Sequence, residues 1–411
     1  MDLHFLGHHI QSRLDSSQLK IAPTKVLTST RILHAQTIEV LWLSWCDTIV
    51  RYQESADMWR TMYLGTGLIH AQADHLANAR EINDTVSETR DSIEFFGGAM
   101  HDGLRGYVFS QGSSNQVVLF ATDLEMEAGV SEVEVYAVDE DLMIPAIRMK
   151  SGGSILVSTK SLATGKERVL NFEDLAELRA HLKSGFIDSP SVPIAGHFTP
   201  SQWCTNSTTA VAIDSAGRLF TAAHDLRYPT CLGRPCEDST GFEPVPYLSE
   251  ICIEKIACGG YLAAAASYDG ELFTWGQACP GSEGQLSVRS RISASDDTED
   301  VSSTTGIFDD LPKEDQDDLI KLLTIQINSQ VARVSDVAIG HGHIWVAAEA
   351  QGSDGVIKRC VFAAGDNSSG QLGLGTERKF VEEFEEVTWL RDKKVVQLNA
   401  AAWSTSIVTV E

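Results

Sequence analysis

Short apolar stretches separated by glycine-rich turns recur along this chain, and they predict β-strands joined by tight hairpins. Two strings show the pattern most plainly, RCVFAAGDNSSGQLGLGT at residues 359–376 and ELFTWGQACPGSEGQLS at residues 271–287. In the first string, the apolar run from Cys360 to Ala364 predicts a buried strand. Gly365-Asp366-Asn367 follows, and these residue types tolerate the positive φ of a tight turn.

The two strings are copies of one repeat. A glycine ends each strand, Gly276 or Gly365, and a Gly-Gln-Leu triplet follows it. Such self-similarity indicates a fold built from successive similar units. The repeat positions that we expect to be structural are Gly7, Gly65, Gly276, Gly284, Gln285, Leu286, Gly365, Asn367, Gly370, Gln371, Leu372, Gly373 and Gly375.

Both strings resemble the repeat of the regulator of chromosome condensation family, in Asp-Gly-x-Leu-Phe-Thr-Trp-Gly before Gly-Gln-Leu and in Gly-Asp-Asn-Ser-Ser-Gly-Gln-Leu-Gly-Leu-Gly. The resemblance implies an all-β fold, a seven-bladed β-propeller with repeats of roughly 50 residues. It is specific for these two copies and extends to the other units only through weaker copies. On this basis, residues 1–411 form a single propeller with short helical insertions.

Hairpin turns mark the weaker copies. The predicted turns are Glu54-Ser55-Ala56-Asp57, Gly152-Gly153, Ser215-Ala216-Gly217, Asp269-Gly270 and Asp354-Gly355. One unit is expected to end near residue 123 and the next to begin with a strand at Val133.

The segment Leu3 to Gly7 has no earlier strands, and Val395 to Val410 lacks a last one. Because an open sheet edge carries unpaired backbone groups, we expect these two ends to pair and close the ring.

Three tryptophans, Trp45, Trp203 and Trp403, stand at matching places before a predicted strand. We expect them to pack between blades.

Two segments do not fit the repeat. Residues 170–185 place Phe172, Leu175, Leu178 and Leu182 at helical spacing, with Asn171 as a candidate N-cap, so we expect a helical insertion. Residues 288–329 form an acidic insertion. Its first half is polar and low in aromatic residues, which favours disorder. Its second half has Pro312 and acidic residues before a Leu/Ile stripe, which predicts a helix.

The composition narrows the class of protein. The net charge is −25, which disfavours direct nucleic-acid binding and favours a basic partner, although acidity also serves solubility. Eight cysteines are scattered, mostly in strand-like runs, as expected of buried thiols in a reducing compartment. No apolar run approaches the roughly 20 residues of a membrane span, and the first residues do not have the pattern of a signal peptide. We therefore expect a cytoplasmic or nuclear protein with no membrane contact.

The search for chemistry gives no catalytic, cofactor or metal site. Gly373-x-Gly375 is not followed by the lysine of a phosphate loop, and no nucleophile elbow or metalloprotease helix is present. Cys231 and Cys236 lack a second ligand pair nearby. His8-His9 and His341-Gly342-His343 are conceivable ligands, but we expect a structural role for both pairs. In the related family a histidine at the turn before the second strand is held by backbone groups.

These patterns favour a non-enzymatic scaffold or regulatory subunit that binds another protein through one loop face. We expect a monomeric propeller within a heteromeric complex. The contact residues that we expect in the acidic insertion are Asp309, Asp310, Asp315, Asp317 and Asp318.

The family resemblance leaves alternatives open. One is a guanine nucleotide exchange factor for a small GTPase, although the loop residues of that activity cannot be matched here. Another is the alpha-tubulin suppressor type of propeller, which partners a small metal-binding protein in tRNA wobble modification and diphthamide synthesis. A third is the propeller that partners a jumonji-type oxygenase, because its end similarly carries a Trp-x-Thr strand.

Overall fold

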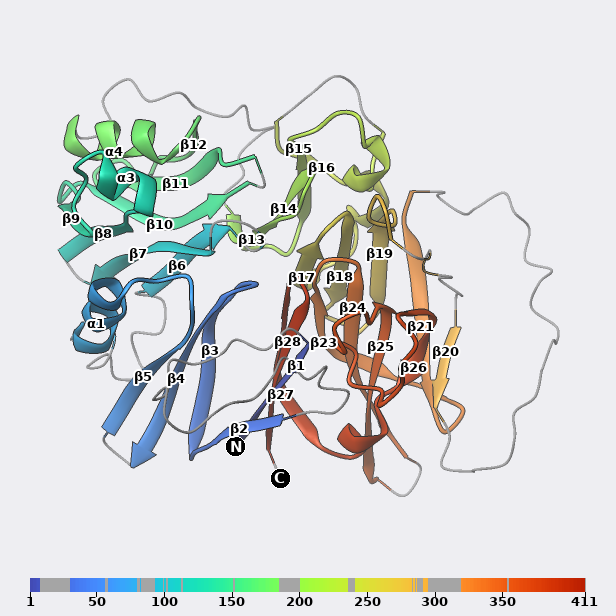
Figure 1. Cartoon of the computed structure of the whole chain (residues 1–411). Coiled ribbons are helices and arrows are strands. Elements are labelled where there is room, and N and C mark those ends of the chain that lie inside the picture. The colour runs from blue at the N-terminus through green and yellow to red at the C-terminus, as the bar shows by residue number, and fades with distance from the viewer. Residues whose placement is uncertain are drawn as a thin grey trace.

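The computed structural model shows a seven-bladed β-propeller, as the repeat predicts. It describes residues 1–7, 30–55, 58–79, 82, 93–98, 100, 103–111, 114–150, 152–184, 200–235, 241–282, 284, 286, 291–294, 319–352 and 355–410. The described strands form seven sheets, which follow one another along the chain from blue to red in Figure 1. No helix in these ranges is both long and apolar enough to cross a membrane.

The blades are numbered here in chain order. Blade 1 contains β3 (Thr37–Leu43), β4 (Asp47–Ser55) and β5 (Met58–Gly65). Blade 2 contains β6 (Ile93–Gly98), β7 (Gly103–Gln111), β8 (Ser114–Phe120) and β9 (Val133–Ala137). Blade 3 contains β10 (Leu142–Met149), β11 (Ile155–Ser161) and β12 (Glu167–Phe172). Blade 4 contains β13 (Pro200–Thr205), β14 (Thr209–Asp214), β15 (Leu219–Ala223) and β16 (Glu243–Pro244).

Blade 5 contains β17 (Ile253–Gly259), β18 (Leu262–Ser267), β19 (Leu272–Gly276), β21 (Lys321–Ile327), β20 (Arg291–Ala294) and β22 (Gln330–Val331). Blade 6 contains β23 (Arg333–Ile339), β24 (His343–Gln351), β25 (Ile357–Asp366) and β26 (Phe380–Glu386). Blade 7 contains β27 (Lys394–Ala401), β28 (Ser404–Val410), β1 (Asp2–Gly7) and β2 (Thr30–His34). The helices are α1 (His70–Asn78), α3 (Asp123–Glu127) and α4 (Leu175–Ser184), with 3-10 turns η2 (Pro229–Leu232), η3 (Pro246–Leu248) and η4 (Thr388–Leu390).

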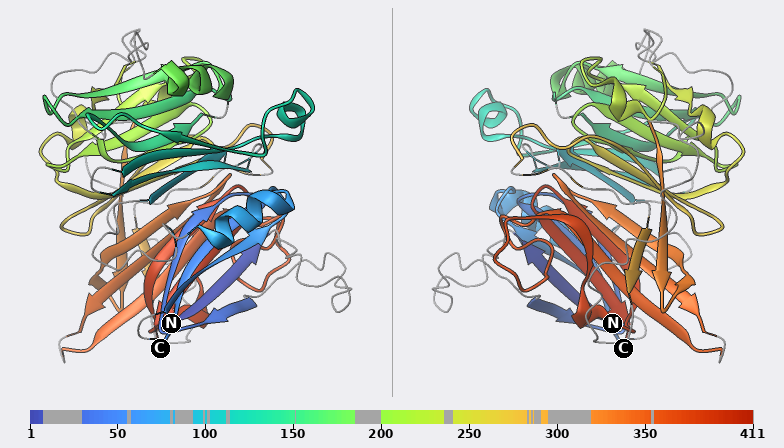
Figure 2. Two further views of the ribbon diagram at one scale, coloured as in Figure 1. Left: turned by 90° about the vertical axis from the view of Figure 1, so that its left-hand side faces the viewer. Right: turned by 90° about the vertical axis from the view of Figure 1, so that its right-hand side faces the viewer.

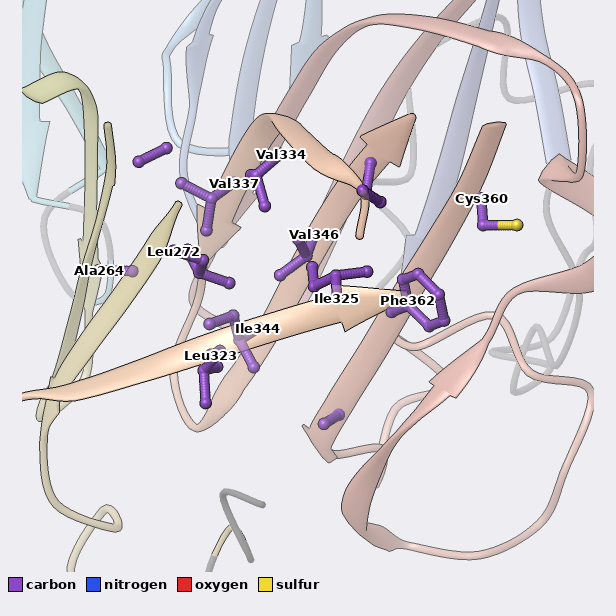
Figure 3. Close-up of a cluster of buried hydrophobic side chains, with 14 of the residues drawn as sticks. Ala264, Leu272, Leu323, Ile325, Val334, Val337, Ile344, Val346, Cys360 and Phe362 are labelled. Carbon is purple, nitrogen blue, oxygen red and sulfur yellow. The ribbon is translucent and has the colours of Figure 1, made fainter. Parts of the chain in front are cut away.

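The first strand of each blade lines the axis of the ring. β3 packs against β6, β6 against β10, and so on through β13, β17, β23 and β27, which returns to β3. The core consequently lies between blades. Figure 3 shows one such layer, where Leu272 and Ile325 of blade 5 meet Val334, Val346 and Phe362 of blade 6.

The two chain ends close the ring, as predicted. β1 pairs antiparallel with β28, so that His4 lies opposite Ile407, Phe5 opposite Ser406 and Gly7 opposite Ser404. β2 then pairs with β1 as the outer strand of the same blade. Figure 1 shows the N- and C-termini side by side.

Polar contacts cross every junction between blades. From the junction of blades 1 and 2 to that of blades 7 and 1, the contacting pairs are Asp47 with Leu104, Glu94 with Arg148, Arg148 with Trp203, Gln202 with Glu254, Lys255 with Asp336, Asp336 with Leu398, and Gln397 with Val40. Most use a side chain of one inner strand and the backbone of the next, so they fix the blades relative to one another.

Several boundaries differ from the sequence-based predictions. The strand at Val133 is β9, the outer strand of blade 2, and not the first strand of the next blade. The helical insertion is α4, and it begins at Leu175. Asn171 and Phe172 belong to β12, and the amide of Glu177 donates to Asp174 Oδ1 at 2.8 Å, so Asp174 takes the capping role expected of Asn171.

The predicted helix at the end of the acidic insertion is wrong for its described part. Lys321–Ile327 is strand β21, which pairs antiparallel with β19. Leu323, Ile325 and Ile327 are buried at alternate positions, which is the period of a strand. β20 lies in the half expected to be disordered and pairs parallel with β21. Residues 295–318, with the predicted helix start at Pro312, lie outside the described ranges.

The predicted hairpin turns fall between the strands as expected where they are described. Gly217, Gly270 and Gly355 all have positive φ. Ala56, Asp57 and Asp354 are not among the described residues. Trp203 does not share the turn position of Trp45 and Trp403, because it lies buried within β13.

Candidate functional site

The two faces of the ring carry different connections. Because the first three strands of each blade pair antiparallel, the turn after the first strand and the link after the third lie on the same face. We call this the loop face, because the described parts of the long links begin on it, such as residues 224–235, 277–282 and 367–379. The opposite face holds short hairpins between second and third strands, such as residues 215–218 and 268–271.

Aromatic side chains from four blades gather on the loop face. We call this group the aromatic patch, and its members are Tyr228, Tyr261, His341 and Trp403. The rings of Tyr228 and Tyr261 meet edge to face with centroids 5.0 Å apart, and those of His341 and Trp403 do so at 5.9 Å. All four side chains are half-buried, so part of each residue stays exposed to solvent.

Cys279 joins the two halves of the patch. Its Sγ lies 3.9 Å from His341 Nδ1, and a Cβ added to Gly260, the neighbour of Tyr261, would lie 2.6 Å from that sulfur. Only glycine fits this close approach. The amide of Gln277 also donates to the carbonyl of Tyr261 at 3.0 Å, which ties the link of blade 5 to its own inner turn.

Backbone hydrogen bonds hold the inner turns rigidly. The amide of His341 donates to the carbonyl of Ala402 at 2.7 Å, and the amide of Ser207 donates to that of Gly260 at 2.9 Å. These bonds connect blade 6 to blade 7 and blade 4 to blade 5. The patch is therefore preorganised, and binding to it would order few side chains.

Carboxylates flank the aromatic rings. Asp225 is ion-paired with Arg227, whose guanidinium lies 5.7 Å from the ring centroid of Tyr228. Hydrogen bonds from Arg227 lower the pKa of Asp225. Asp366, on the other side, accepts from the amide of Ser368 at 2.9 Å and is half-buried.

The Cys279 thiol in the patch is not an activated nucleophile at neutral pH. Burial raises the pKa of Cys279 to about 11, so its thiol stays protonated at neutral pH. Burial likewise raises the pKa of Tyr261. Across the described ranges, no three His, Cys, Asp or Glu side chains come together in a way that could hold a metal ion.

Comparison with known proteins supports the fold and leaves the activity open. No protein-family model and no curated protein sequence matches the chain. Among solved structures, Prp20p from Saccharomyces cerevisiae is similar over the whole of this chain and 91% of that protein, with 13% identity and a TM-score of 0.57. Human WBSCR16 is similar over the full length of both chains, with 11% identity and a TM-score of 0.55. Yeast RCC1 (Prp20) bound to Kap60 gives a TM-score of 0.56 at 13% identity, over all of this chain and 89% of that one. The chain has an RCC1-like propeller fold.

The repeat residues have structural contacts in this RCC1-like propeller. Asn367 organises the last link, because its Nδ2 donates to the carbonyl of Arg378 at 2.8 Å and its Oδ1 accepts from the amide of Leu372 at 3.1 Å. Leu372 is buried, and the carbonyl of Gln371 accepts from Trp345 Nε1 at 3.2 Å.

The glycines of the repeat allow close packing. A Cβ on Gly7 would lie 2.1 Å from the carbonyl of Trp403, and one on Gly365 would lie 2.2 Å from that of Gly342. In the earlier copy, Gly284 lies against Phe380 and Leu286 packs beside the blade 5 core, whereas Gln285 is not among the described residues.

The two described histidines of the predicted pair have different surroundings. His343 is fully buried at the start of β24, and its Nε2 lies 3.0 Å from Thr405 Oγ1. It is thus held across blades 6 and 7 by a hydroxyl. His341 belongs to the aromatic patch. His8 and His9 lie outside the described ranges.

Other candidate residues receive little support as a site. Cys231 is buried and its Sγ donates to the carbonyl of Tyr261 at 3.4 Å, whereas Cys236 is not described. The predicted contact residues Asp309, Asp310, Asp315, Asp317 and Asp318 all fall in the undescribed range 295–318.

Sequence reasoning missed Tyr228 and Tyr261 as members of a site. Tyr261 occupies the turn before a second strand, the same place as His341 and Trp403 in the next two blades. Aligning the seven turns would have brought Tyr261, His341 and Trp403 together, whereas Tyr228 lies in the link after β15.

Proposed function

We propose that this chain is a non-enzymatic protein-interaction module that binds a protein partner through its loop face, with the aromatic patch as anchor. The observation that carries the proposal is the gathering of half-buried Tyr228, Tyr261, His341 and Trp403 from four blades. Tyrosine and tryptophan dominate the energetic centres of protein interfaces, because they bury a large area at a small entropic cost.

The charge of the molecule supports a basic partner. The net charge of −25 attracts cationic proteins over long range, and Asp225 and Asp366 flank the patch. Electrostatic attraction of this kind mainly raises the association rate. We therefore expect partner binding to weaken as salt is added.

The test uses two tyrosines at opposite ends of one strand. Tyr261 precedes β18 on the loop face, and Tyr268 follows β18 on the opposite face, where it is 65% exposed. Partners are first identified by quantitative affinity purification from the source cell. Their affinity for purified wild type, Tyr261→Ala and Tyr268→Ala proteins is then measured by calorimetry.

We expect Tyr261→Ala to weaken binding by about tenfold or more, as loss of an interface hot spot does, and Tyr268→Ala to leave it unchanged. The opposite ranking would place the interface on the other face and defeat the proposal. Changing the five aspartates between residues 309 and 318 to asparagine, in the same assay, tests the predicted role of the acidic insertion.

A second candidate function is guanine nucleotide exchange on a small GTPase. It is favoured by the whole-chain similarity to Prp20p, a protein described together with its binding to Gsp1p and histones. The measurement is release of a fluorescent guanine nucleotide from a panel of small GTPases, and unchanged release rates would eliminate this candidate. The alpha-tubulin suppressor alternative and the cytoplasmic or nuclear location stay predictions.

A further inference from the structure

Among the residues that the structure describes, blade 1 has one strand fewer than its two neighbours. Blades 7 and 2 each have four strands, with β2 and β9 outermost, whereas blade 1 ends at β5. In Figure 1, β5 forms the outer edge of the blue blade and α1 lies at its upper end; the left view of Figure 2 shows this side of the molecule. α1 is fixed to blade 2 through Gln72, whose Nε2 donates to the carbonyls of Ala121 and Glu132. It also contacts β5, but as a helix it does not pair with the backbone of that strand.

The pairing of β4 with β5 shows which backbone groups face the open edge. The amide of Thr66 donates to the carbonyl of Cys46 at 3.0 Å, and Asp47 lies opposite Gly65. Because hydrogen-bonded and non-hydrogen-bonded pairs alternate, Leu64, Met62 and Arg60 bond to β4. The N–H and C=O groups of Trp59, Thr61 and Tyr63 therefore point away from the blade. Within the described ranges, no other strand pairs with β5.

This edge lacks the features that keep other edges unpaired. β5 has eight residues, no proline and one charged side chain, Arg60. β26, the edge of blade 6, carries four glutamates, and β12 is packed by α4. β2 and β9 have five residues each, and β16 has two. Charges, short length and covering elements are the usual protection against strand addition. α1 contacts β5, but in Figure 1 it lies at the upper end of the strand, and β5 is the longest of these edges with only one charged side chain.

The side chains beside the edge add apolar and aromatic surface. Met58 is 44% exposed, and the Trp59 ring is covered by the guanidinium of Arg51 at 4.4 Å. Exposed Arg60 is already ion-paired with Glu54. A strand added here could therefore place alternate side chains over apolar surface.

We propose that β5 binds an extended cationic segment of a partner protein, which adds to blade 1 as its fourth strand. The open edge requires an occupant in β conformation, bonded to the backbone of Trp59, Thr61 and Tyr63. The chain's net charge of −25 favours a cationic segment with apolar residues at alternate positions. The same charge opposes a second copy of this chain, since two such copies repel each other. This surface is distinct from the aromatic patch and does not depend on it.

A single substitution can block pairing at the open edge without disturbing the pairing inside blade 1. Thr61→Pro removes an outward N–H and leaves the β4–β5 hydrogen bonds intact, and proline is tolerated at such edge positions. Thr61→Val is the matched control, because it keeps the N–H and nearly the same volume. Its lost hydroxyl has no hydrogen-bond partner.

The probe is a short synthetic peptide that alternates lysine and valine, and its binding is followed by fluorescence anisotropy. We expect equal affinity for wild type and Thr61→Val and a loss of about tenfold or more for Thr61→Pro. Amide hydrogen exchange at Trp59, Thr61 and Tyr63 should slow when the peptide binds. A peptide with alternate amides N-methylated should not bind, and this result holds even if Thr61→Pro fails to fold.

Several outcomes would overturn the proposal. Absence of binding, or equal binding to Thr61→Pro, would show that the edge is not the site. Equal binding of a glutamate–valine peptide would refute the cationic occupant. A dimer in sedimentation velocity that Thr61→Pro abolishes would assign the edge to a second copy of the chain.

Discussion

At the residue scale, polar groups buried in the inner turns connect neighbouring blades. Asp47 is fully buried, yet its carboxylate has no cation beside it in the described structure and instead accepts from four donors. These are the Tyr63 hydroxyl, the Cys46 thiol at 3.2 Å, and the amides of Gly67 and Leu104 at 3.0 and 2.9 Å. Burial and this carboxylate raise the pKa of Cys46 to about 12. The carboxylate of Asp47 thus connects blade 1 to blade 2, whereas backbone hydrogen bonds connect the inner turns of blades 4 and 5 and of blades 6 and 7.

His343 has the corresponding place in blade 6. It is fully buried, and burial lowers its pKa to about 4, so it is neutral at physiological pH. In the unfolded chain an ordinary histidine has a pKa of about 6.5. Between these two values the unfolded state binds more protons than the folded state, so stability falls as the pH falls.

We predict that acidification from pH 7 to pH 5 lowers the free energy of unfolding by about 2 kcal/mol through His343 alone. His343→Gln keeps a group that can bond Thr405 and cannot titrate, so its stability should depend less on pH over that interval. Urea denaturation of both proteins at the two pH values measures the difference. Identical pH slopes would contradict the buried neutral histidine.

How far the sequence predicts single residues depends on whether their contacts are local. Asn367 and Gly370 were recognisable because the link they organise lies within about a dozen residues of the same string. Tyr261 and Asp47 were not recognisable, because their roles arise from contacts with residues of other blades. A spacing pattern contains no information on such contacts.

At the element scale, a β-bulge places the bridging side chain of several inner strands. The pairing shifts immediately before Gln202 in β13, Lys255 in β17, Asp336 in β23 and Gln397 in β27. Each of these residues contacts the next blade. Bulges redirect side chains and increase the twist of a strand. The same irregularity therefore twists the blade and directs a side chain to the neighbouring blade.

We predict that Gln397→Leu destabilises the protein by about 2 kcal/mol. Its side chain accepts from the amide of Val40 at 2.9 Å and donates to the carbonyl of Val40 at 2.8 Å, and leucine would leave both backbone groups without their partner. Gln202→Leu is the matched control, since Gln202 is exposed and makes one such bond, to Glu254. Chemical denaturation should give Gln397→Leu a clearly lower free energy of unfolding than Gln202→Leu. Equal effects would argue against a stabilising role for the contact between Gln397 and Val40 at the junction of blades 7 and 1.

Element type was hardest to predict where apolar residues allow two periods. Residues 319–327 contain Leu and Ile at spacings that fit a helix stripe and a strand alternation equally well. The segment forms a strand because it pairs with β19, and a long insertion separates these two strands in the sequence. α4 was found because its apolar spacing has no competing strand partner.

At the scale of the whole molecule, two well-matched repeat copies were enough to predict the architecture, because they resemble the repeat of a family whose fold is a seven-bladed propeller. Once Gly365 and Gly276 marked the unit, the incomplete first and last segments could only share a blade. The outer strands varied and were not predictable, since β9, β16 and β21 each add to their blade after a link of different length. The inner strands define the ring, and the outer ones are free to diverge.

We predict that closure by β1 makes the ring unfold cooperatively, and Leu3→Ala tests this. Leu3 is fully buried where β1 packs with Val408, Val40 and Val50, between blades 7 and 1. We predict a loss of about 3 kcal/mol in the free energy of unfolding, as for a leucine deleted from a core.

The form of the transition is as informative as its position. Since each blade is packed by two neighbours, weakening the closing strand should lower the stability of all seven blades together. Tryptophan fluorescence and far-UV circular dichroism should therefore report one coincident transition at a lower urea midpoint. Leu124→Ala, at a leucine that is 77% exposed, is the control and should change little. Separate transitions in Leu3→Ala would mean that blade 7 can unfold while the other blades stay folded. In that case the pairing of β1 would stabilise blade 7 alone and would not be the source of cooperativity.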